Sequence, residues 1–296
     1  MMGWLATQLG IGFMRVLAWM PLGWVRGLGF ALGWLLYRAV ASRRRIVLTN
    51  LRLCFPGLPE HERVAIARQT FICFAQTWLD RSWLWHAPRE VLLRRLQLRG
   101  ALYEFEDNRP LIMFCPHFYG LDAGGTAINM RINRDFISIY TPQSNPQLDE
   151  WIRTGRLRFG RARLFHRIDG VKAILKALRQ GEGLYLLPDM DFGPDGSVFV
   201  PFFGVQAACV PSVSRFARLG RAKVISVVPR LTATGYDIEV LPAWKDFPTD
   251  DQVADTARVN RHLEEIIATM PAQYYWVHKR FKTRPPGEAS VYDSDD

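Results

Sequence analysis

The stretch LIMFCPHFYGLD, at residues 111–122, joins five apolar residues to a turn that carries His117 and Asp122. A short apolar run of this kind is typical of a strand that is buried on both faces of a sheet. Similar runs recur along the chain, at residues 136–140, 162–165, 183–188, 223–229 and 236–241.

Segments with helical character separate these runs. Apolar residues recur at helical spacing over residues 60–85, and Asn145 followed by Pro146 is a typical helix start. Gly181 closes a predicted helix in the segment DGVKAILKALRQGEG, and further helices are expected at residues 207–219 and 252–269. This alternation predicts an α/β fold with a mostly parallel central sheet flanked by helices.

The composition excludes several classes of protein. Of the 296 residues, 22% are charged and 12% are aromatic, so the chain is neither disordered nor of low complexity. The four cysteines lie far apart, which argues against a zinc site and a disulfide framework and favours a reducing compartment. The net charge is +10, and residues 1–100 carry the excess because they hold 14 arginines and four acidic residues.

The N-terminus is typical of a membrane-associated helical segment. Residues 3–37 contain two charges, Arg15 and Arg26, and four of the ten tryptophans, which favour the membrane interface. The late first charge and the lack of a small-residue cleavage site predict retention rather than removal as a signal peptide. Pro21 and the two arginines interrupt the apolar stretch. The pattern therefore leaves three alternatives open: a short or tilted spanning element, a monotopic segment and a buried hairpin.

Two further features of this region bear on its surroundings. The pairs Gly23/Gly27 and Gly29/Gly33 have the spacing that lets helices approach closely. A basic cluster at residues 38–45 follows the apolar stretch, which predicts retention of that end on the cytoplasmic side of a membrane.

His117 comes directly after the predicted strand at 111–115. In open α/β sheets, ligands bind beyond the carboxyl ends of the strands. If the loop turns back, Asp122 can hold one imidazole N–H of His117 and leave the other nitrogen to take a proton from a hydroxyl. No serine nucleophile accompanies the pair, so the attacking oxygen would belong to the substrate. A purely structural histidine is the alternative.

Three long blocks accompany this pair along the chain. They are YTPQSNPQLDEWIRTGRLRFG at 140–160, LLPDMDFGPDGSVFVPFFG at 186–204 and QYYWVHKRFKTRPPG at 273–287. The spacing of His117 and Asp122 resembles the H-x4-D/E motif of glycerolipid and lysophospholipid acyltransferases. The blocks resemble those of the late acyltransferases of lipid A biosynthesis, and the resemblance covers residues 1–287.

The resemblance implies a glycerolipid-acyltransferase-like fold and a defined reaction. A fatty acyl chain would move from acyl carrier protein to a hydroxyl of a 3-hydroxyacyl chain on a Kdo-bearing lipid A precursor, in lipopolysaccharide biosynthesis. His117 would act as general base and Asp122 would stabilise the imidazolium. No metal or separate cofactor is expected, because the donor itself carries phosphopantetheine. Relatives often carry Glu in place of Asp122, and Met190 replaces a residue that is often polar.

The same resemblance implies the partners and the division of the chain. The partners are acyl carrier protein, the lipid A precursor and inner-membrane lipid, and no nucleic acid is expected. Residues 1–45 would be the membrane segment with its basic flank, residues 46–284 the acyltransferase domain on the cytoplasmic side of the inner membrane, and residues 285–296 a disordered acidic tail.

Further site residues follow from the blocks. Arg156 and Arg158 match the arginines of the GRLRFG segment, and we expect them to bind a phosphate or to steady the oxyanion, with Arg167 aligned less firmly. Asp189, the first acid of PDMD, is expected near the polar head of the substrate. Arg280, Lys282 and Arg284 of the 273–287 block would meet carrier protein or lipid phosphates, the alternative being a C-terminal strand with a basic edge. A solvated arginine face and a plain turn are the alternatives.

Two other functions compete with this one. An acyl-CoA-dependent phospholipid or glycerolipid acyltransferase would more typically carry an E-G-T-R block, where this chain has PDMDFG. A non-enzymatic protein that binds a membrane surface or nucleic acid through its arginines leaves His117 and Asp122 without an explanation.

Overall fold

The computed structural model describes residues 2–166 and 170–292. Its main sheet has seven strands in the order β1-β9-β8-β2-β5-β3-β4. The pairs β8–β2, β2–β5, β5–β3 and β3–β4 are parallel, and β9 runs antiparallel to β8. The strands are β1 (Leu96–Gly100), β2 (Leu111–Phe114), β3 (Phe136–Tyr140), β4 (Ala162–His166), β5 (Gly183–Leu186), β8 (Lys223–Thr232) and β9 (Gly235–Val240).

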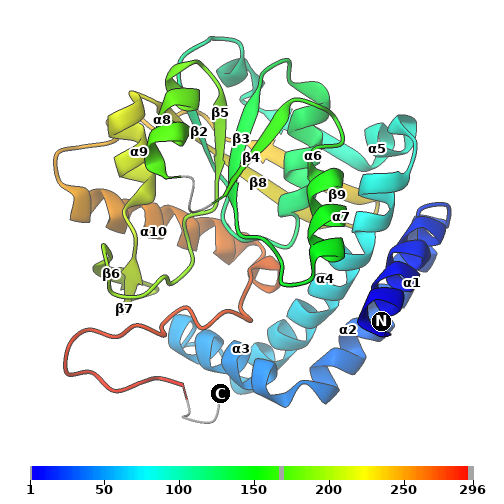
Figure 1. Ribbon diagram of the computed structural model, residues 1–296. Coiled ribbons are helices and arrows are strands. Elements are labelled where there is room, and N and C mark those ends of the chain that lie inside the picture. The colour runs from blue at the N-terminus through cyan, green and yellow to red at the C-terminus, as the bar shows by residue number, and fades with distance from the viewer. Residues whose placement is uncertain (1, 167–169, 293–296) are drawn as a thin grey trace.

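Helices cover both faces of this sheet, which confirms the predicted α/β architecture (Figure 1). They are α1 (Met2–Leu17), α2 (Leu22–Ala39), α3 (Ala41–Cys54), α4 (Glu60–His86), α5 (Arg89–Arg95), α6 (Leu121–Arg131), α7 (Pro146–Arg156), α8 (Val171–Arg179), α9 (Ser212–Gly220) and α10 (Gln252–Thr269). Short 3-10 turns lie at Leu102–Phe105, after β1, and at Pro271–Gln273, after α10.

Strand β2 lies at the centre and contributes to two cores. Its four residues are fully buried, which is why the sequence shows an unbroken apolar run. Ile112 and Phe114 pack with side chains of α8, α9 and α10, whereas Leu111 and Met113 pack with side chains of α6 and α7. The alternation of the strand therefore places one core on each side of the sheet.

One predicted helix is wrong at its start. The segment expected to be helical at 207–219 begins as strand β7 (Val205–Cys209), which pairs antiparallel with β6 (Val198–Phe202), and α9 follows only at Ser212. Residues 205–209 have no charge and fit either conformation, and the pairing with β6 decides for the strand.

The N-terminal helices α1 and α2 lie along α4 (Figure 1). Gly29 and Gly33 allow this approach, since a Cβ on Gly33 would lie 2.5 Å from the Cα of Ile72 and one on Gly29 2.7 Å from Cγ of Gln76. The expected close approach is confirmed at this pair but is wrong for Gly23 and Gly27, where a Cβ would meet no atom within 4 Å. In the described part of the chain, none of the helices combines the length and the apolar character needed to cross a bilayer.

Arg26 of α2 points inward rather than toward a membrane surface. It forms an ion pair of 2.9 Å with Asp80 of α4, whose side chain is fully buried. Asp80 also accepts hydrogen bonds from Nε1 of Trp83 and from the hydroxyl of Tyr236. The charge that interrupts the apolar stretch is therefore part of the core.

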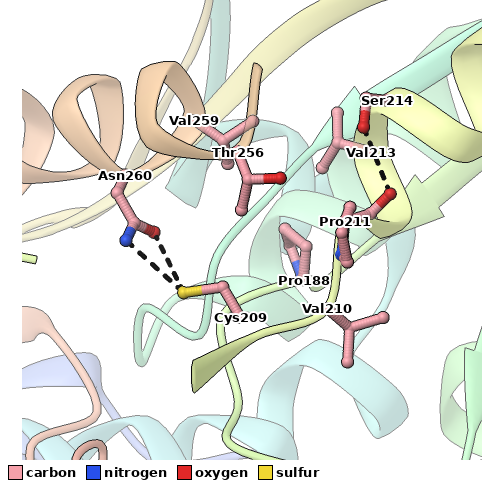
Figure 2. Close-up of a pocket in the computed structure, with 9 residues that line it drawn as sticks. All are labelled: Pro188, Cys209, Val210, Pro211, Val213, Ser214, Thr256, Val259 and Asn260. Atoms are coloured by element: carbon pink, nitrogen blue, oxygen red, sulfur yellow. Dashed lines mark hydrogen bonds between the residues drawn. The ribbon is translucent and has the colours of Figure 1, made fainter. Parts of the chain in front are cut away.

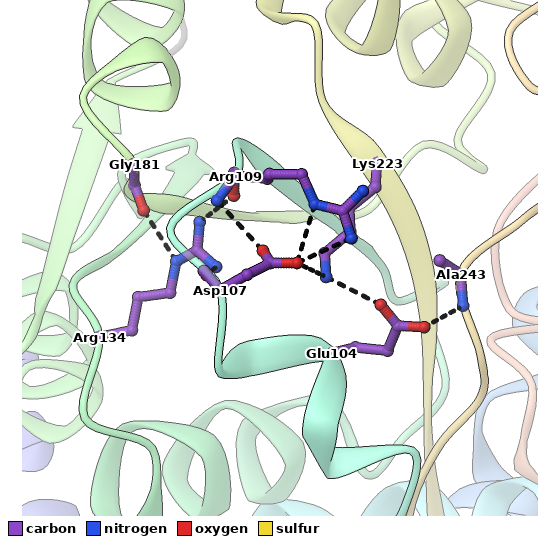
Figure 3. A network of polar contacts seen from close by, with 7 residues as sticks. All are labelled: Glu104, Asp107, Arg109, Arg134, Gly181, Lys223 and Ala243. Carbon is purple, nitrogen blue, oxygen red and sulfur yellow. Dashed lines mark hydrogen bonds and ion pairs between the residues drawn. The ribbon is translucent and has the colours of Figure 1, made fainter.

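The amino-terminal edge of the sheet is held by a polar network (Figure 3). Nζ of Lys223, at the start of β8, lies 2.8 Å from Glu104 and 3.0 Å from Asp107. Arg134 donates to the carbonyl oxygens of Gly181 and Asp107. This network is at the edge opposite to the ends of the strands where ligands bind, so we assign it to stability.

The C-terminal segment differs from the expected disordered tail over the part that is described. The side chain of Tyr292 is buried, and its hydroxyl contacts the amide of Phe281 and the side chain of Asn50. Residues 286–290 are exposed, but the chain returns to the core beside α3 at Tyr292, and residues 293–296 lie outside the described residues.

Candidate active site

His117 meets Asp189 at the carboxyl end of the sheet. Phe114 of β2 pairs with Leu186 of β5, and His117 and Asp189 each follow three residues later. Nδ1 of His117 lies 2.8 Å from Oδ1 of Asp189, and the backbone amide of His117 donates to both carboxylate oxygens at 3.1 Å. Burial by itself would raise the pKa of Asp189, but His117 holds this pKa below its usual range.

This pairing corrects the partner that we expected for the imidazole. We expected the carboxylate of Asp122 to hold a ring nitrogen of His117, but Asp189 holds Nδ1 and Asp122 binds two arginines instead. Nε of Arg81 donates to Oδ2 of Asp122 at 2.8 Å, and Nε of Arg156 donates to Oδ1 at 2.9 Å. Asp122 lies in the first turn of α6, where the loop does not turn back onto Nδ1 of His117.

The buried Asp122 is held in its charged form by these two arginines. Its side chain is 7% exposed. Burial by itself would raise the pKa of Asp122, but Arg156 and Arg81 lower it to about 2. Arg156 lines the cavity described below together with His117 and Asp122, so the three residues that the sequence singled out first do share one site.

Close packing of α7 on α4 brings Arg156 to this site. Asn145 caps α7 by accepting from the amides of Gln147 and Leu148, as its position before Pro146 predicted. Gly155 lies against the ring of Trp85, where a Cβ would come within 2.2 Å of Cδ2. A side chain at this position would push α7 away and move its neighbour Arg156.

The other arginines of this region that the structure describes do not line the cavity. Arg158 donates to the carbonyl oxygens of Leu84 and Ala87 at the end of α4, so it caps that helix and does not serve the substrate role that we expected. Separate acidic partners on the surface hold three more: Arg153 pairs with Glu150, Arg161 with Asp135 and Arg163 with Glu182. Arg167 lies outside the described residues.

The 273–287 block is bound to the body of the protein and has a structural role. Thr283 donates to Asp191 through its amide and its hydroxyl, each at 2.8 Å, which ties the block to the PDMD turn. Arg280 is 2% exposed and donates to the carbonyl oxygen of Ala208 and to Sγ of Cys209. Arg280 is therefore not available to an acidic partner, contrary to our expectation for this block.

Cys115 lies two residues from His117 but is unsuited to act as a nucleophile. Its thiol is fully buried and donates to the hydroxyl of Tyr185 at 2.8 Å. Burial raises the pKa of Cys115 to about 12, so the thiolate is scarcely populated at neutral pH.

A large apolar cavity opens beside His117. Its volume is about 620 Å³, which lies within the range of small-molecule sites, ~300–1,000 Å³. Every residue of β3 lines it, and so do the fully buried Met113 and Ile128, whereas its polar lining includes His117, Asp122 and Arg156. By contrast, the hollow between α10 and residues 209–214 has about 10 Å³ (Figure 2), room for no more than one water.

This arrangement suits proton transfer next to an apolar chain. With Nδ1 of His117 donating to Asp189, Nε2 is the nitrogen that can accept a proton, and among the described residues it has no hydrogen-bond partner. Among the same residues no cluster of histidine, cysteine and acidic side chains is suited to hold a metal ion.

Sequence reasoning missed Arg81, which is the second arginine on Asp122. It lies on the inner side of α4, with its guanidinium 4.2 Å from the ring centroid of Trp78. Nη1 of Arg81 is buried and has no hydrogen-bond partner in the described part of the chain. The signal in the sequence was the charged pair at 80–81, inside a stretch of the helix, residues 71–85, that carries no other charge.

Comparison with known proteins gives consistent matches. A family model described as bacterial lipid A biosynthesis acyltransferase matches residues 2–283. The lipid A biosynthesis lauroyltransferase of Escherichia coli K12 is 34% identical over 98% of this chain and 95% of its own length. The lipid A biosynthesis palmitoleoyltransferase of the same strain is 31% identical over 98% of this chain and 94% of its own length. The lipid A biosynthesis myristoyltransferase of that strain is 33% identical over 86% of this chain and 80% of its own length.

Proposed function

The chain belongs to the family of bacterial lipid A biosynthesis acyltransferases, and from that premise we propose the donor, the acceptor group and the mechanism. It is an acyltransferase that acts on a lipid A precursor. The donor is acyl carrier protein, and the acceptor is a hydroxyl of a 3-hydroxyacyl chain on a Kdo-bearing precursor. The observation that carries the proposal is the His117–Asp189 pair at the polar end of an apolar cavity.

The reaction begins with general-base catalysis by His117. Nε2 takes the proton of the acceptor hydroxyl while its oxygen attacks the thioester carbonyl carbon of the donor. The buried carboxylate of Asp189, 2.8 Å from Nδ1, stabilises the imidazolium that forms. The tetrahedral intermediate then collapses, the C–S bond breaks, and the phosphopantetheine thiolate takes the proton from His117.

Arg156 supports the charge that develops next to His117. Its side chain is 31% exposed and lines the cavity, while Asp122 accepts a hydrogen bond from its Nε. Asp122 thus acts as a positioning residue for Arg156, and Arg81 balances the second carboxylate oxygen. A preorganised cation at this place stabilises an oxyanion or binds a phosphate of the precursor.

The acyl chain of the donor occupies the apolar part of the cavity. The five lining residues of β3 extend for about 13 Å at the usual rise of a strand. Gly125 of α6 also lines the cavity, and a Cβ there would meet no atom within 4 Å. The space in front of Gly125 is therefore open to a chain.

The N-terminal helices bind the inner membrane from its cytoplasmic side, with their apolar outer surface in the lipid. Trp19 and Trp24 are 80% and 70% exposed, and such a patch is typical of an interfacial element. We call this region the hairpin surface, and its large exposed apolar side chains are Trp4, Leu5, Leu9, Phe13, Val16, Trp19, Trp24, Leu28, Phe30, Trp34 and Leu35.

The hairpin surface is close to the mouth of the cavity. Nδ2 of Asn145 donates to Oγ1 of Thr7 at 2.8 Å, so α1 touches the start of α7. Gln143, two residues before Asn145, lines the cavity. An acceptor held in the bilayer would therefore reach His117 from the side on which α1 lies.

The test uses purified full-length protein and mass spectrometry of the products. Acyl carrier protein and acyl-CoA serve as donors, and a Kdo-bearing lipid A precursor and a glycerolipid serve as acceptors. We expect transfer from the carrier protein to the lipid A precursor, and His117→Ala to remove it with an unchanged circular dichroism spectrum. Preference for acyl-CoA and the glycerolipid would instead establish the competing phospholipid activity.

Membrane binding is tested separately by flotation with vesicles and by protease treatment of spheroplasts. Replacement of Leu9 and Phe13 by serine should weaken flotation, since it removes two exposed apolar side chains. Unchanged flotation of this variant, or cleavage of the catalytic domain from the periplasmic side, would contradict the proposed attachment.

A further inference from the structure

Helices α8 and α9 carry a basic outer surface, on which Arg218 is paired with Asp250 from outside the two helices. Residues 171–180 and 212–221 contain no acidic residue. Their six basic side chains are all exposed. We call this region the α8–α9 surface and define it by Lys172, Lys176, Arg179, Arg215, Arg218 and Arg221.

The two helices form one surface because they pack directly against each other. Gly220 lies so close to Leu178 that a Cβ there would come within 2.3 Å of its Cδ2. Arg179 of α8 donates to the carbonyl oxygen of Leu219 of α9 at 2.8 Å. The positive charges are therefore held in fixed positions relative to one another rather than scattered over separate elements.

The same helices form a wall of the cavity on their inner side. Val171 and Ile174 of α8 and Phe216 of α9 line it. The outer side of α8 carries a shallow hollow of about 370 Å³ lined by Lys172, Lys176 and neighbouring residues of the helix. A partner bound on this surface is thus separated from the cavity by a single helix.

We propose that the α8–α9 surface is the docking site of the acyl carrier protein. This inference rests on the proposed function. Acyl carrier proteins are small acidic proteins, and charge complementarity steers and orients such partners. Helix α8 is about 14 Å long at 1.5 Å per residue. Gly170, just before the start of this helix, lines the cavity together with His117, so the phosphopantetheine arm of a carrier docked here would extend along α8 and enter the cavity at this end.

An anionic membrane is the other partner that a basic surface can bind, and the distribution of apolar residues argues against it. The large exposed apolar side chains gather on the hairpin surface, whereas within the described parts of α8 and α9 they are Val171 and Leu219. In Figure 1 the hairpin and the pair α8 and α9 lie on opposite sides of the molecule. The lipid acceptor and the protein donor would then approach the cavity from different sides.

The test combines charge reversal on this surface with two acyl donors, one that includes the carrier protein and one that lacks it. The variant Lys172→Glu/Lys176→Glu changes two exposed lysines that have no ion-pair partner among the described residues, and Arg94→Glu on α5 is the matched control. Each protein is assayed with acyl carrier protein and with acyl-phosphopantetheine, which lacks the carrier. Circular dichroism verifies folding, and the single variant Lys176→Glu replaces the double variant if the latter does not fold.

We expect the double variant to raise KM for the acyl carrier protein on the order of tenfold at low salt, with kcat unchanged. The difference should shrink as salt is added. Neither the kinetics with acyl-phosphopantetheine nor the Arg94→Glu control should change.

Three results would overturn the docking proposal. They are an unchanged KM for the carrier, an equal loss with both donors, and a loss of binding to anionic vesicles with unchanged donor kinetics. If the wild-type protein transfers from neither donor to the lipid A precursor, the proposed function fails instead, and this outcome is distinct from the other three.

Discussion

Asp189→Asn should reduce kcat far more than its modest change in size suggests. The carboxylate of Asp189 is 2% exposed and accepts from Nδ1 and the backbone amide of His117. An amide at this place turns an NH2 group toward one of these N–H donors and carries no charge to stabilise the imidazolium. We expect a loss of about 10²–10⁴ in kcat, or ~3–5 kcal/mol in the activation free energy.

The assay is transfer of the acyl chain from acyl carrier protein to a purified lipid A precursor, with circular dichroism to monitor folding. Residues that act as a unit lose activity non-additively, so His117→Ala/Asp189→Asn should be no slower than His117→Ala alone. A folded Asp189→Asn enzyme that keeps more than about a tenth of the wild-type rate would refute the assignment. So would additive losses in the double variant.

The remaining predictions concern the residues around this pair. Arg156→Ala should cut kcat by roughly tenfold to a hundredfold, because it removes a charge-assisted contact in the cavity, whereas Arg163→Ala, at a surface pair, should have almost no effect; equal effects in the transfer assay would contradict this. Asp122→Asn should lower the free energy of unfolding at pH 7 by about 2 kcal/mol, since the pKa of Asp122 falls from 3.8 to about 2 on folding. Because the folded-state pKa is lowered, the wild type keeps this stability above pH 3.8 and loses it toward pH 2, so the two unfolding temperatures should converge there; a constant difference would refute the ion pairs. Gly125→Leu should shift the preferred donor to a shorter acyl chain, because the leucine side chain enters the cavity. Mass spectrometry of the products from donors of graded chain length measures this preference, and an unchanged preference would contradict the prediction.

The parts of the fold that local chemistry determines could be predicted from the sequence. Helix α7 starts where Asn145 and Pro146 predict it, because the cap and the first turn involve adjacent residues. The range 252–269 of α10 and the range 136–140 of β3 also agree with the prediction. Strand β7 was mistaken for helix because its conformation depends on pairing with β6, which local periodicity does not report.

Four residues that the sequence singled out lie together, namely His117, Asp122, Arg156 and Asp189, but their pairings were not predicted and Arg81 was missed. His117 and Asp189 lie 72 residues apart, and they meet because β2 and β5 are neighbours in the sheet although β3 and β4 lie between them in the chain. Strand order of this kind is not encoded in any single segment. Asp122 was given the wrong neighbour for the same reason, since its arginine partners come from α4 and α7.

The ion pair between Arg26 and Asp80 joins the N-terminal helical hairpin and the candidate active site into a single packed unit. Asp80 is adjacent in sequence to Arg81, so α2 is fixed to the same turn of α4 that holds Asp122. Enzymologists who remove the hairpin to obtain a shorter fragment should therefore lose activity along with it. A detergent that separates α2 from α4 should inhibit the enzyme without entering the cavity. The measured rate should therefore depend on the detergent used in purification.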